Sequence, residues 1–320
     1  TDVDDSREGI TDHFTENAFL SSFGGGIGGY WGHVRSSGTK TSKGSESTGV
    51  IPFVKVVDAE MLAFSQGVTR RGSYAGYLDI DHPEIEEFLD IRKPTGGDTN
   101  RKCLNLHHGV VIPDKFMEII HKATKEPGFD DSWELIDPHS GEVKKVVSAR
   151  TLWVKLLQNR METGEPYLMF EDAVNADLPD FQKNKGLRVH HSNLCSEITL
   201  ATNDERTAVC CLSSVNLEYY DEWKKVPAFI PDLIRMLDNV LESFIQNAPQ
   251  QLERAKFSAL RERSLGLGAM GFHAYLQKNG ISFESPLASA INYEMFDSCL
   301  LYTSDAADEG LGVDLGGRRI

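Results

Sequence analysis

The sequence predicts an α/β fold whose strands run mostly parallel. Patterns typical of amphipathic helices alternate along the chain with short apolar patterns typical of strands. This alternation favours a parallel sheet, because parallel strands are joined by crossover helices. At 320 residues with 40% hydrophobic content, the chain is long enough to bury a large core, as one α/β domain or as part of one.

Charge and cysteine content narrow the functional classes. A net charge of −15 and a pI near 5.1 argue against nucleic-acid binding, since an acidic chain repels a phosphate backbone. Five cysteines without a framework spacing suit a reducing compartment. No apolar run is long enough to span a bilayer, and Thr1 opens neither a signal peptide nor a chain that starts with Met. We therefore expect a cytoplasmic protein without membrane contact. We also expect that this sequence starts within a longer protein.

The N-terminal part predicts a helix, a glycine strand and a polar loop. Residues 2–19 are acidic and then amphipathic, and Asp4, Asp5 and Ser6 are natural caps for this helix. The glycine run at 24–29 is neither a dinucleotide-binding turn nor a P-loop, because β-prone residues follow it. It favours either a strand that a ligand approaches closely or a tight bend. Residues 36–49, rich in Gly, Ser and Thr, have the composition of a flexible linker.

The middle of the chain is predicted to alternate between helices, strands and loops. In chain order, we expect a turn at 51–57, a helix at 58–65, a basic loop at 66–76, a strand at 77–80, a helix at 81–89, a strand at 104–112, a helix at 115–123, strand pieces within 129–146, a helix at 149–163 and a buried strand at 166–170. Asp81 is expected to cap its helix, and Gly164 to close the last one. His107 and His108 face opposite sides of their strand, which favours structural roles. The inward-facing side chains of the last helix are expected to be Trp153, Leu156, Leu157 and Met161.

The C-terminal part predicts two more strands and a long helix. A short strand that includes Cys210 is expected within 207–217. A helix is expected at 230–245, with Ile234, Leu237, Leu241 and Phe244 on one face. A glycine-spaced strand within 261–272 is expected to lead into a helix near 274–278.

Asn193, Cys195 and Glu197 form the strongest candidate site. If residues 188–198 form a strand, side chains two positions apart share a face, so all three would meet one ligand. A cysteine beside an amide and a carboxylate can act as a nucleophile, a metal ligand or a hydrogen-atom carrier. Zinc is disfavoured, because the chain has no Cys-x-x-Cys pair and the adjacent histidines of this segment would point in opposite directions. The alternative is a buried core thiol.

Two sequence blocks carry a resemblance to a known family. Residues 192–198 read S-N-L-C-S-E-I and residues 208–217 contain C-C-L-S-S-V-N-L, with Cys195 and Cys210 separated by 15 positions (210 − 195 = 15). Both blocks resemble the active-site segments of the large catalytic subunit of ribonucleotide reductase, whose patterns are S-N-L-C-x-E-I and C-x-L-S-x-x-N-L. Further matches lie at 24–29, 65–72 and 263–268, so the resemblance extends from about Val3 to about Phe296.

The resemblance implies a ten-stranded α/β barrel, the fold shared with glycyl-radical enzymes, with the Cys195 loop inside it. Residues 1–298 would be an incomplete catalytic barrel domain that includes the effector specificity loops. Residues 299–320 instead resemble translated adapter sequence from sequencing libraries, so we expect a non-native tail in which Cys299 carries no chemistry. Residues 28–33 are more similar to the class I enzymes, which receive their radical from a small subunit, than to the cobalamin-dependent class.

By this resemblance, four residues carry the chemistry. Cys195 would become a thiyl radical and take the hydrogen from the 3′-carbon of the ribose. Glu197 would be the general base for the 3′-hydroxyl, and Asn193 would orient the sugar hydroxyls. Cys210 would belong to the dithiol that supplies two electrons, and its partner thiol would lie upstream of this chain. Cys211 departs from the family pattern, which usually has a hydroxyl or small residue there.

The resemblance also implies substrate and effector sites. Substrate contacts are expected at Gly25, Gly26, Ser192 and Leu194. The effector is a deoxynucleoside triphosphate or ATP. Its base and sugar are expected at Asp5, Ser6, Arg7 and Ile10, its triphosphate at Arg35, Lys40 and Lys43, and the readout of its identity at Gln66, Arg70 and Arg71.

The implied activity is the reduction of ribonucleoside diphosphates to deoxyribonucleotides, coupled to dithiol oxidation. The chain is expected to bind no metal or other cofactor, because the radical comes from a dimetal small subunit. Expected partners are that small (beta) subunit, a second copy of the chain, thioredoxin or glutaredoxin, and ribonucleoside diphosphates. As a fragment, the chain alone is expected to be inactive. The alternatives are a cobalamin-dependent (class II) ribonucleotide reductase and a non-catalytic deoxynucleotide-binding module in which Cys195 is incidental.

Overall fold

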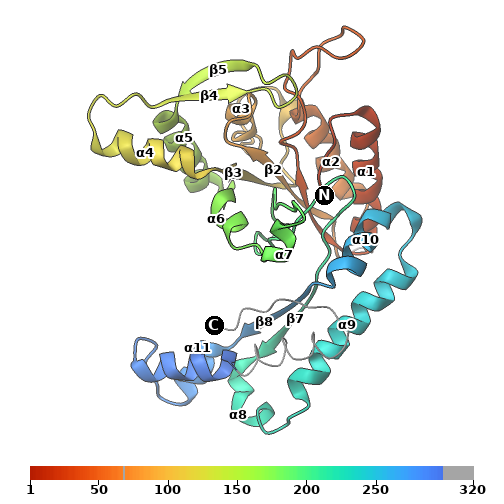
Figure 1. Cartoon of the computed structure of the whole chain (residues 1–320), viewed down its shortest axis with the longest axis vertical. Coiled ribbons are helices and arrows are strands. Elements are labelled where there is room, and N and C mark those ends of the chain that lie inside the picture. Colours follow the sequence, from red (N-terminus) through yellow and green to blue (C-terminus); the bar gives the residue numbers. More distant parts are fainter. Residues whose placement is uncertain (68, 298–320) are drawn as a thin grey trace. The chain divides into compact units, whose positions relative to one another are not determined.

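The computed structural model describes residues 1–67 and 69–297, which divide into two compact units (Figure 1). Unit 1 comprises Thr1–Ala208 with Gln250–Arg254, and unit 2 comprises Val209–Pro249 with the chain from Ala255 onward. The expected non-native tail, with Cys299, lies outside the described residues. The single partial barrel domain expected over 1–298 stays a prediction.

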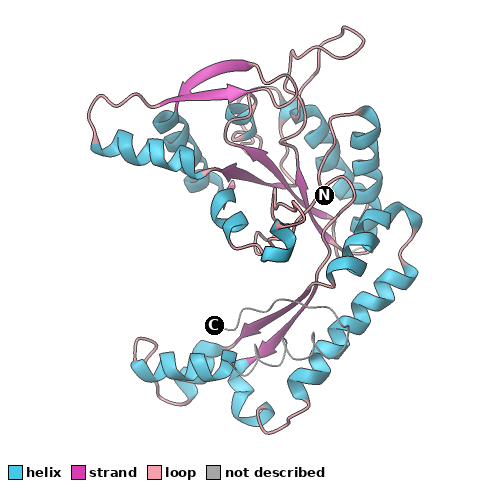
Figure 2. Cartoon of the chain, viewed as in Figure 1, coloured by secondary structure: helices cyan, strands magenta, loops and turns pink. Residues whose placement is uncertain are grey.

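Unit 1 is built on a four-stranded sheet in which every strand runs parallel to its neighbours (Figure 2). Its strands, in the order β1-β2-β3-β6, are β1 Gly26–Tyr30, β2 Ser73–Asp79, β3 His107–Ile112 and β6 Tyr167–Phe170. Helical segments connect these strands, so the predicted α/β class with mostly parallel strands is confirmed. The sheet is open, and no closed barrel is found within residues 1–67 and 69–297.

Helices and one hairpin complete unit 1. The helices are α1 Arg7–Ser22, α2 Ile51–Ala63, α3 Ile85–Phe88, α4 Asp114–Lys125, α5 Ala149–Thr163, α6 Glu171–Ala176 and α7 Asp180–Lys183, with short 3-10 turns η1 Thr99–Arg101 and η3 Gln250–Leu252. The strand pieces expected within 129–146 form an antiparallel hairpin of β4 Ser132–Ile136 and β5 Val143–Ser148. The predictions for α1, α4 and α5 are therefore confirmed, and Gly164 closes α5 in a left-handed conformation as expected.

Three details of the helices differ from the prediction. Helix α2 begins at Ile51, where a turn was expected, because a proline in the first turn needs no backbone donor there. Helix α3 is one turn long and its N-cap position is Glu84, so the predicted cap at Asp81 is wrong. In α5, Leu157 and Met161 are 39% and 90% exposed, so their predicted inward orientation is also wrong.

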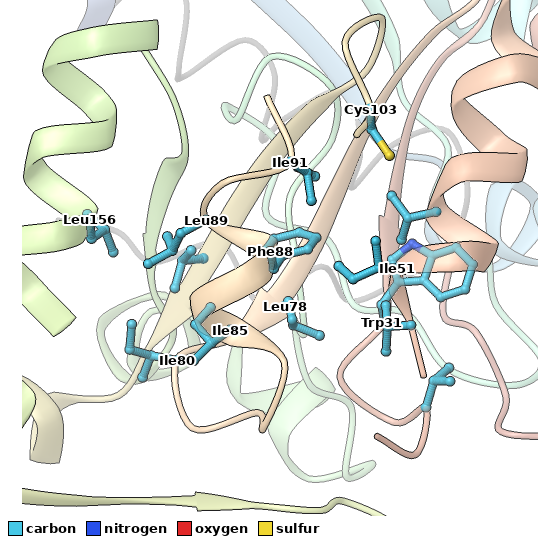
Figure 3. Close-up of a cluster of buried hydrophobic side chains, with 14 of the residues drawn as sticks. Trp31, Ile51, Leu78, Ile80, Ile85, Phe88, Leu89, Ile91, Cys103 and Leu156 are labelled. Carbon is cyan, nitrogen blue, oxygen red and sulfur yellow. The ribbon is translucent and has the colours of Figure 1, made fainter. Parts of the chain in front are cut away.

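The core of unit 1 lies between the sheet and the helices that cover one of its faces. Figure 3 shows side chains from several elements meeting there, among them Leu78 of β2, Ile51 of α2 and Phe88 of α3. Each is fully buried, and burial of a side chain of this size stabilises a fold by roughly 1.5–3 kcal/mol. Cys103 belongs to this core, where burial raises the pKa of its thiol to about 12. It is therefore an unreactive packing residue.

Among the described residues, unit 2 contains a parallel strand pair and several helices, including one at residues 286–297. The strands are β7 Cys211–Asn216 and β8 Leu265–Met270, and the other helices are α8 Tyr220–Trp223, α9 Phe229–Asn247, α10 Glu253–Glu262, which begins in unit 1, and α11 Phe272–Lys278, with the 3-10 turn η2 Leu217–Tyr219. Helix α9 buries Leu237, Leu241 and Ile245, whereas the predicted Phe244 is only partly buried. Cys210 immediately precedes β7 and does not lie within the strand.

Candidate functional site

The segment that carries Asn193, Cys195 and Glu197 is a turn, not a strand. Residues 194–196 form the turn, and Ser196 takes a left-handed backbone conformation with φ of 68°. A strand residue cannot adopt this conformation, so the prediction that three alternating side chains share one strand face is wrong. We call residues 192–198 the site loop.

The site loop is held closed by its own side chains. The side-chain oxygen of Asn193 accepts hydrogen bonds from the backbone nitrogens of Glu197 and Ile198, each at 3.2 Å. The hydroxyl of Ser192 donates to the carbonyl of Ile198 at 2.7 Å. Asparagine and serine side chains compete in this way with the ladder bonds of a sheet, which explains why an alternating sequence forms a turn here.

The site loop packs against strands β1 and β2 of the sheet in unit 1. A Cβ atom on Gly28 would collide with the carbonyl oxygen of Ser192, and one on Gly26 would lie 2.9 Å from Leu194 Cδ2. The hydroxyl of Tyr77 in β2 donates to the carbonyl of Asn193 at 2.7 Å. The glycine run thus admits a close approach, as expected, but the chain's own loop makes that approach. Gly25, also expected at the substrate site, is exposed and immediately precedes β1.

Cys195 and Glu197 are both exposed on the site loop. Burial of part of the thiol, and then the nearby carboxylate of Glu197, raise the pKa of Cys195 above its ordinary value. A raised pKa keeps the sulfur protonated at neutral pH. This state suits a donor and acceptor of hydrogen atoms and disfavours a thiolate nucleophile.

A carboxylate that no sequence pattern marks out, Glu165, contacts the row of the sheet that lies under the site loop. Glu165 accepts from Nδ1 of His107 and lies 3.1 Å from Nδ1 of His108, and these two contacts lower the pKa of its carboxyl to about 2 despite its burial. The ring of Tyr167 stacks on His107 with a centroid distance of 6.1 Å. His107 pairs with Ala75 and Tyr167 with Gly109, in the rows of the sheet that also hold Gly28 and Tyr77 beneath the site loop.

The second candidate thiol belongs to unit 2. The sulfur of Cys210 lies 3.8 Å from the carbonyl oxygen of Cys211. A Cβ atom on Gly266 of the neighbouring strand would collide with Cδ2 of Leu212 and would lie at ordinary contact distance, 3.4 Å, from this sulfur, so the glycine makes room for Leu212.

The structure brings together some of the residues expected at the effector site. The guanidinium of Arg35 forms an ion pair with Asp5 at 2.8 Å, and Asp5 also lies 3.1 Å from Nδ1 of His139. Ser6 is the N-cap of α1, where its hydroxyl accepts from the backbone nitrogen of Gly9. Ser6 therefore caps the helix, and its contact with an effector stays a prediction. Arg7 is exposed and Ile10 is 8% exposed, so only the former is open to a ligand in this structure.

Residues 36–49, the first basic loop, are fixed at both ends by buried carboxylates. Asp137 accepts from the backbone and hydroxyl of Ser36 and from the hydroxyl of Thr39, at 2.6–2.8 Å. These bonds hold the pKa of Asp137 well below its usual range, although burial opposes them. At the other end, Glu84 accepts from the backbone nitrogen of Val50 at 2.8 Å. Between these anchors, Lys40 and Lys43 are exposed.

The second basic loop, expected over 66–76, ends at Gly72 because β2 begins at Ser73, and its described residues reach the glycine strand. Gln66 and Arg70 pair through an isolated β-bridge, and the side chain of Arg70 donates to the carbonyl of Gly24 at 3.0 Å. Arg71 is exposed. The loop therefore lies against the start of the strand that supports the site loop.

In residues 1–67 and 69–297, no helix combines the length and the apolar character needed to cross a membrane.

The family described as "Ribonucleotide reductase, barrel domain" matches residues 1–309 of the chain. The chain is 50% identical over 286 residues to a protein assigned as the ribonucleoside-diphosphate reductase large subunit of Frog virus 3 (isolate Goorha), covering 88% of this chain and 48% of that protein.

Two further relatives agree with this match. The ribonucleoside-diphosphate reductase large subunit of Invertebrate iridescent virus 3 is 42% identical, over 91% of this chain and 52% of its own length. The solved structure of the Actinobacillus ureae class Id ribonucleotide reductase alpha subunit matches with a TM-score of 0.79 and 35% identity, covering 97% of this chain and 54% of that one. The chain thus spans about half the length of the relatives compared here.

Proposed function

The chain belongs to the ribonucleotide reductase family, and from this premise we propose that it is the catalytic barrel portion of a ribonucleoside-diphosphate reductase large subunit. The fold class is that of the family's barrel, of which the described residues form an open part. One observation carries the proposal. A protonated, exposed thiol sits on a turn that Asn193 fastens, with a carboxylate two residues away.

In this proposal, the small subunit supplies the radical, and this chain's residues use it. The sulfur radical of Cys195 takes the hydrogen atom from the ribose 3′-carbon, while Glu197 takes the proton of the 3′-hydroxyl. The 2′-hydroxyl then leaves as water. Cys210 and an upstream thiol supply two electrons and become a disulfide, Cys195 returns the hydrogen atom to the 3′-carbon, and thioredoxin or glutaredoxin reduces the disulfide. A cytoplasmic, reducing location would keep these thiols reduced.

The experiment that tests the proposal compares the wild-type protein, expressed at full length and mixed with its small subunit, with Cys195→Ser. We expect reduction of ribonucleoside diphosphates with a dithiol reductant, and loss of at least a thousandfold in rate in the variant, with unchanged effector binding. Cys211→Ser, a half-buried thiol without a proposed role, is the matched control and should stay active. If the Cys195→Ser variant reduced ribonucleoside diphosphates as fast as the wild type, the proposed role of the thiol would be overturned.

We further propose that the two basic loops bind the effector nucleotide. The support is local, since Arg35 is positioned by Asp5 and the loop that carries Lys40 and Lys43 is anchored at both ends. Arginine and lysine side chains are well suited to a triphosphate. Arg35→Ala should weaken deoxynucleoside triphosphate binding at least tenfold, whereas Arg150→Ala, an exposed arginine of α5, should not. Equal affinity of the two variants would contradict this assignment.

Self-association is the remaining part of the proposal. Four apolar side chains on or next to α1 and α2 are strongly exposed, namely Phe23 (63%), Val56 (46%), Leu62 (49%) and Phe64 (46%). Exposed apolar patches on soluble proteins commonly mark protein interfaces. Sedimentation of the protein with effector nucleotide should give a dimer, and Val56→Glu should shift it to monomer. A Val56→Glu protein that still sediments as a dimer would place the interface elsewhere.

A further inference from the structure

Three potential metal ligands from distant parts of the sequence converge in unit 1. They are Asp2 near the N-terminus, His33 just after β1, and His190, two residues before the site loop. One ligand atom from each lies within 4.8 Å of the other two, and Nδ1 of His190 is 2.8 Å from Oδ2 of Asp2. We propose that these three residues form a binding site for a late first-row divalent cation, with Zn²⁺ as the best fit.

The carboxylate of Asp2 is oriented as a ligand should be. Its side chain is 3% exposed, and the hydroxyl of Thr202 donates to Oδ1 at 2.6 Å. This bond leaves Oδ2 directed at His190. Metal-binding carboxylates are typically held by such an outer hydrogen bond, which fixes the orientation of the ligand atom.

Tyr30 holds both imidazole rings. Its ring stacks on His190 at a centroid distance of 5.3 Å and meets the edge of His33 at 4.9 Å. The two imidazoles are themselves nearly perpendicular, with an interplanar angle of 79° and centroids 5.3 Å apart. The aromatic packing therefore presents two nitrogen ligands beside one carboxylate oxygen without requiring a new backbone arrangement.

The donor set selects the class of metal. Two imidazoles and one carboxylate suit zinc and its neighbours, whereas Ca²⁺ and Mg²⁺ prefer sites made of oxygen atoms. In a tetrahedral site, ligand bonds of about 2.0–2.2 Å place adjacent ligand atoms roughly 3.3–3.6 Å apart, so the Asp2–His190 pair, now 2.8 Å apart, needs to open only slightly to admit the cation. His33 is exposed, and we expect its imidazole to turn away from its present edge contact with Tyr30 to close the remaining gap when a cation binds. Three protein ligands leave a fourth position for water.

Asp2 already forms an isolated β-bridge with Tyr30 of β1, so a metal at this site would add a link from these two segments to His190. Its ligands come from the N-terminal segment, the end of β1 and the residue two positions before Ser192 of the site loop. The bound cation would therefore stabilise the segment that leads into the site loop. It would be separate from the radical cofactor of the small subunit. Metal binding would displace the proton of the hydrogen bond between His190 and Asp2.

The test is a titration of the metal-stripped protein with Co²⁺, read by its visible absorption, and with Zn²⁺, read by thermal unfolding. We expect the wild type to bind one equivalent with tetrahedral Co²⁺ absorption and to unfold at a higher temperature with Zn²⁺. His33→Ala, an exposed position whose change leaves the fold intact, should bind at this site at least tenfold more weakly. Asp2→Asn should behave similarly.

The matched control is His121→Ala, which removes an exposed histidine of α4 and should bind like the wild type. Circular dichroism of each variant confirms that it is folded. If the wild type binds no metal, or if His33→Ala and His121→Ala have the same affinity, the three residues form only an ion pair within an aromatic cluster and the proposal fails. Neither result depends on nucleotide reduction.

Discussion

The side-chain oxygen of Asn193 lies 3.2 Å from the backbone nitrogen of Ile198, and this hydrogen bond closes the site loop from within. The asparagine proposed to orient a substrate is thus also the residue that shapes the loop carrying Cys195. Its two roles can be separated by experiment, because one involves the backbone of the loop and the other involves a bound sugar.

Asn193→Ala should loosen the site loop. The change removes two hydrogen bonds to backbone nitrogens, each worth about 0.5–1.5 kcal/mol. Hydrogen exchange at the amides of Glu197 and Ile198 should therefore accelerate about tenfold. Asn193→Asp keeps an acceptor oxygen and should retain most of the protection. Unchanged exchange in Asn193→Ala would show that other contacts close the loop.

Gly28→Ala should displace the site loop from the sheet. A methyl group at this position collides with the carbonyl oxygen of Ser192 and lies 2.9 Å from the Cα atom of Asn193. Overpacking of this kind typically destabilises by about 1–3 kcal/mol. Urea unfolding should show this loss.

Gly76→Ala is the matched control for this experiment, because Gly76 is also in the sheet and its nearest contact would be 3.4 Å from Tyr74. We expect it to change stability by less than about 1 kcal/mol. Equal losses in the two variants would mean that glycine itself, and not the space beneath the loop, matters at position 28.

Asp137→Asn should destabilise the protein at neutral pH by about 2–3 kcal/mol, since hydrogen bonds to a charged acceptor are stronger than neutral ones. The pKa of Asp137 is depressed in the folded protein, so its ionised form contributes stability at pH values above the ordinary value of 3.8. This contribution is lost as pH falls through the folded-state pKa. The difference between wild type and variant, measured by urea unfolding, should shrink below pH 4. A difference that is constant from pH 7 to pH 3 would contradict this account.

Asp79 should make stability fall as pH rises toward 8. Burial raises the pKa of Asp79 to about 7 from an ordinary 3.8, although the hydroxyl of Tyr30 donates to it at 2.5 Å. A raised folded-state pKa means that the folded protein favours the neutral form of Asp79. The contribution of this group to the free energy of unfolding is therefore fully present below pH 3.8 and is lost as pH rises through about 7.

The measurement is the pH dependence of the free energy of unfolding between pH 5 and pH 8. Asp79→Asn is neutral throughout and keeps an acceptor for Tyr30, so its curve should be flatter than that of the wild type. Asp177→Asn, which removes an exposed carboxylate, should follow the wild type. A wild-type curve parallel to that of Asp79→Asn would show that Asp79 is ionised normally.

The periodic parts of the fold could be predicted from the sequence, because helices and parallel strands leave local patterns. The strands around Tyr77 and Tyr167 and the long helices were identified in this way. The turn at Cys195 could not, since an alternating pattern indicates a strand unless the side chain of Asn193 captures the backbone first.

Long-range contacts left no such pattern. Asp137 lies about a hundred positions from the serine and threonine that it holds, and Glu165 lies far from the two histidines of β3 in sequence. Burial and pairing of these carboxylates depend on the tertiary fold. Spacing along the chain contains no information about them. The motif around Cys195 supports a proposal for the chemistry of the site, but it does not indicate which groups hold the site loop in place.

The two anchors of the first basic loop bear on how much conformational entropy a ligand must remove. Fixing one backbone residue opposes binding by roughly 1–2 kcal/mol at room temperature. Asp137 holds the loop at Ser36 and Thr39, Glu84 holds it at Val50, and a β-bridge joins Lys40 to Glu46. Only the tip around Lys43 is left to become ordered. A triphosphate that contacts this tip would therefore lose little of its binding free energy to restraining the chain.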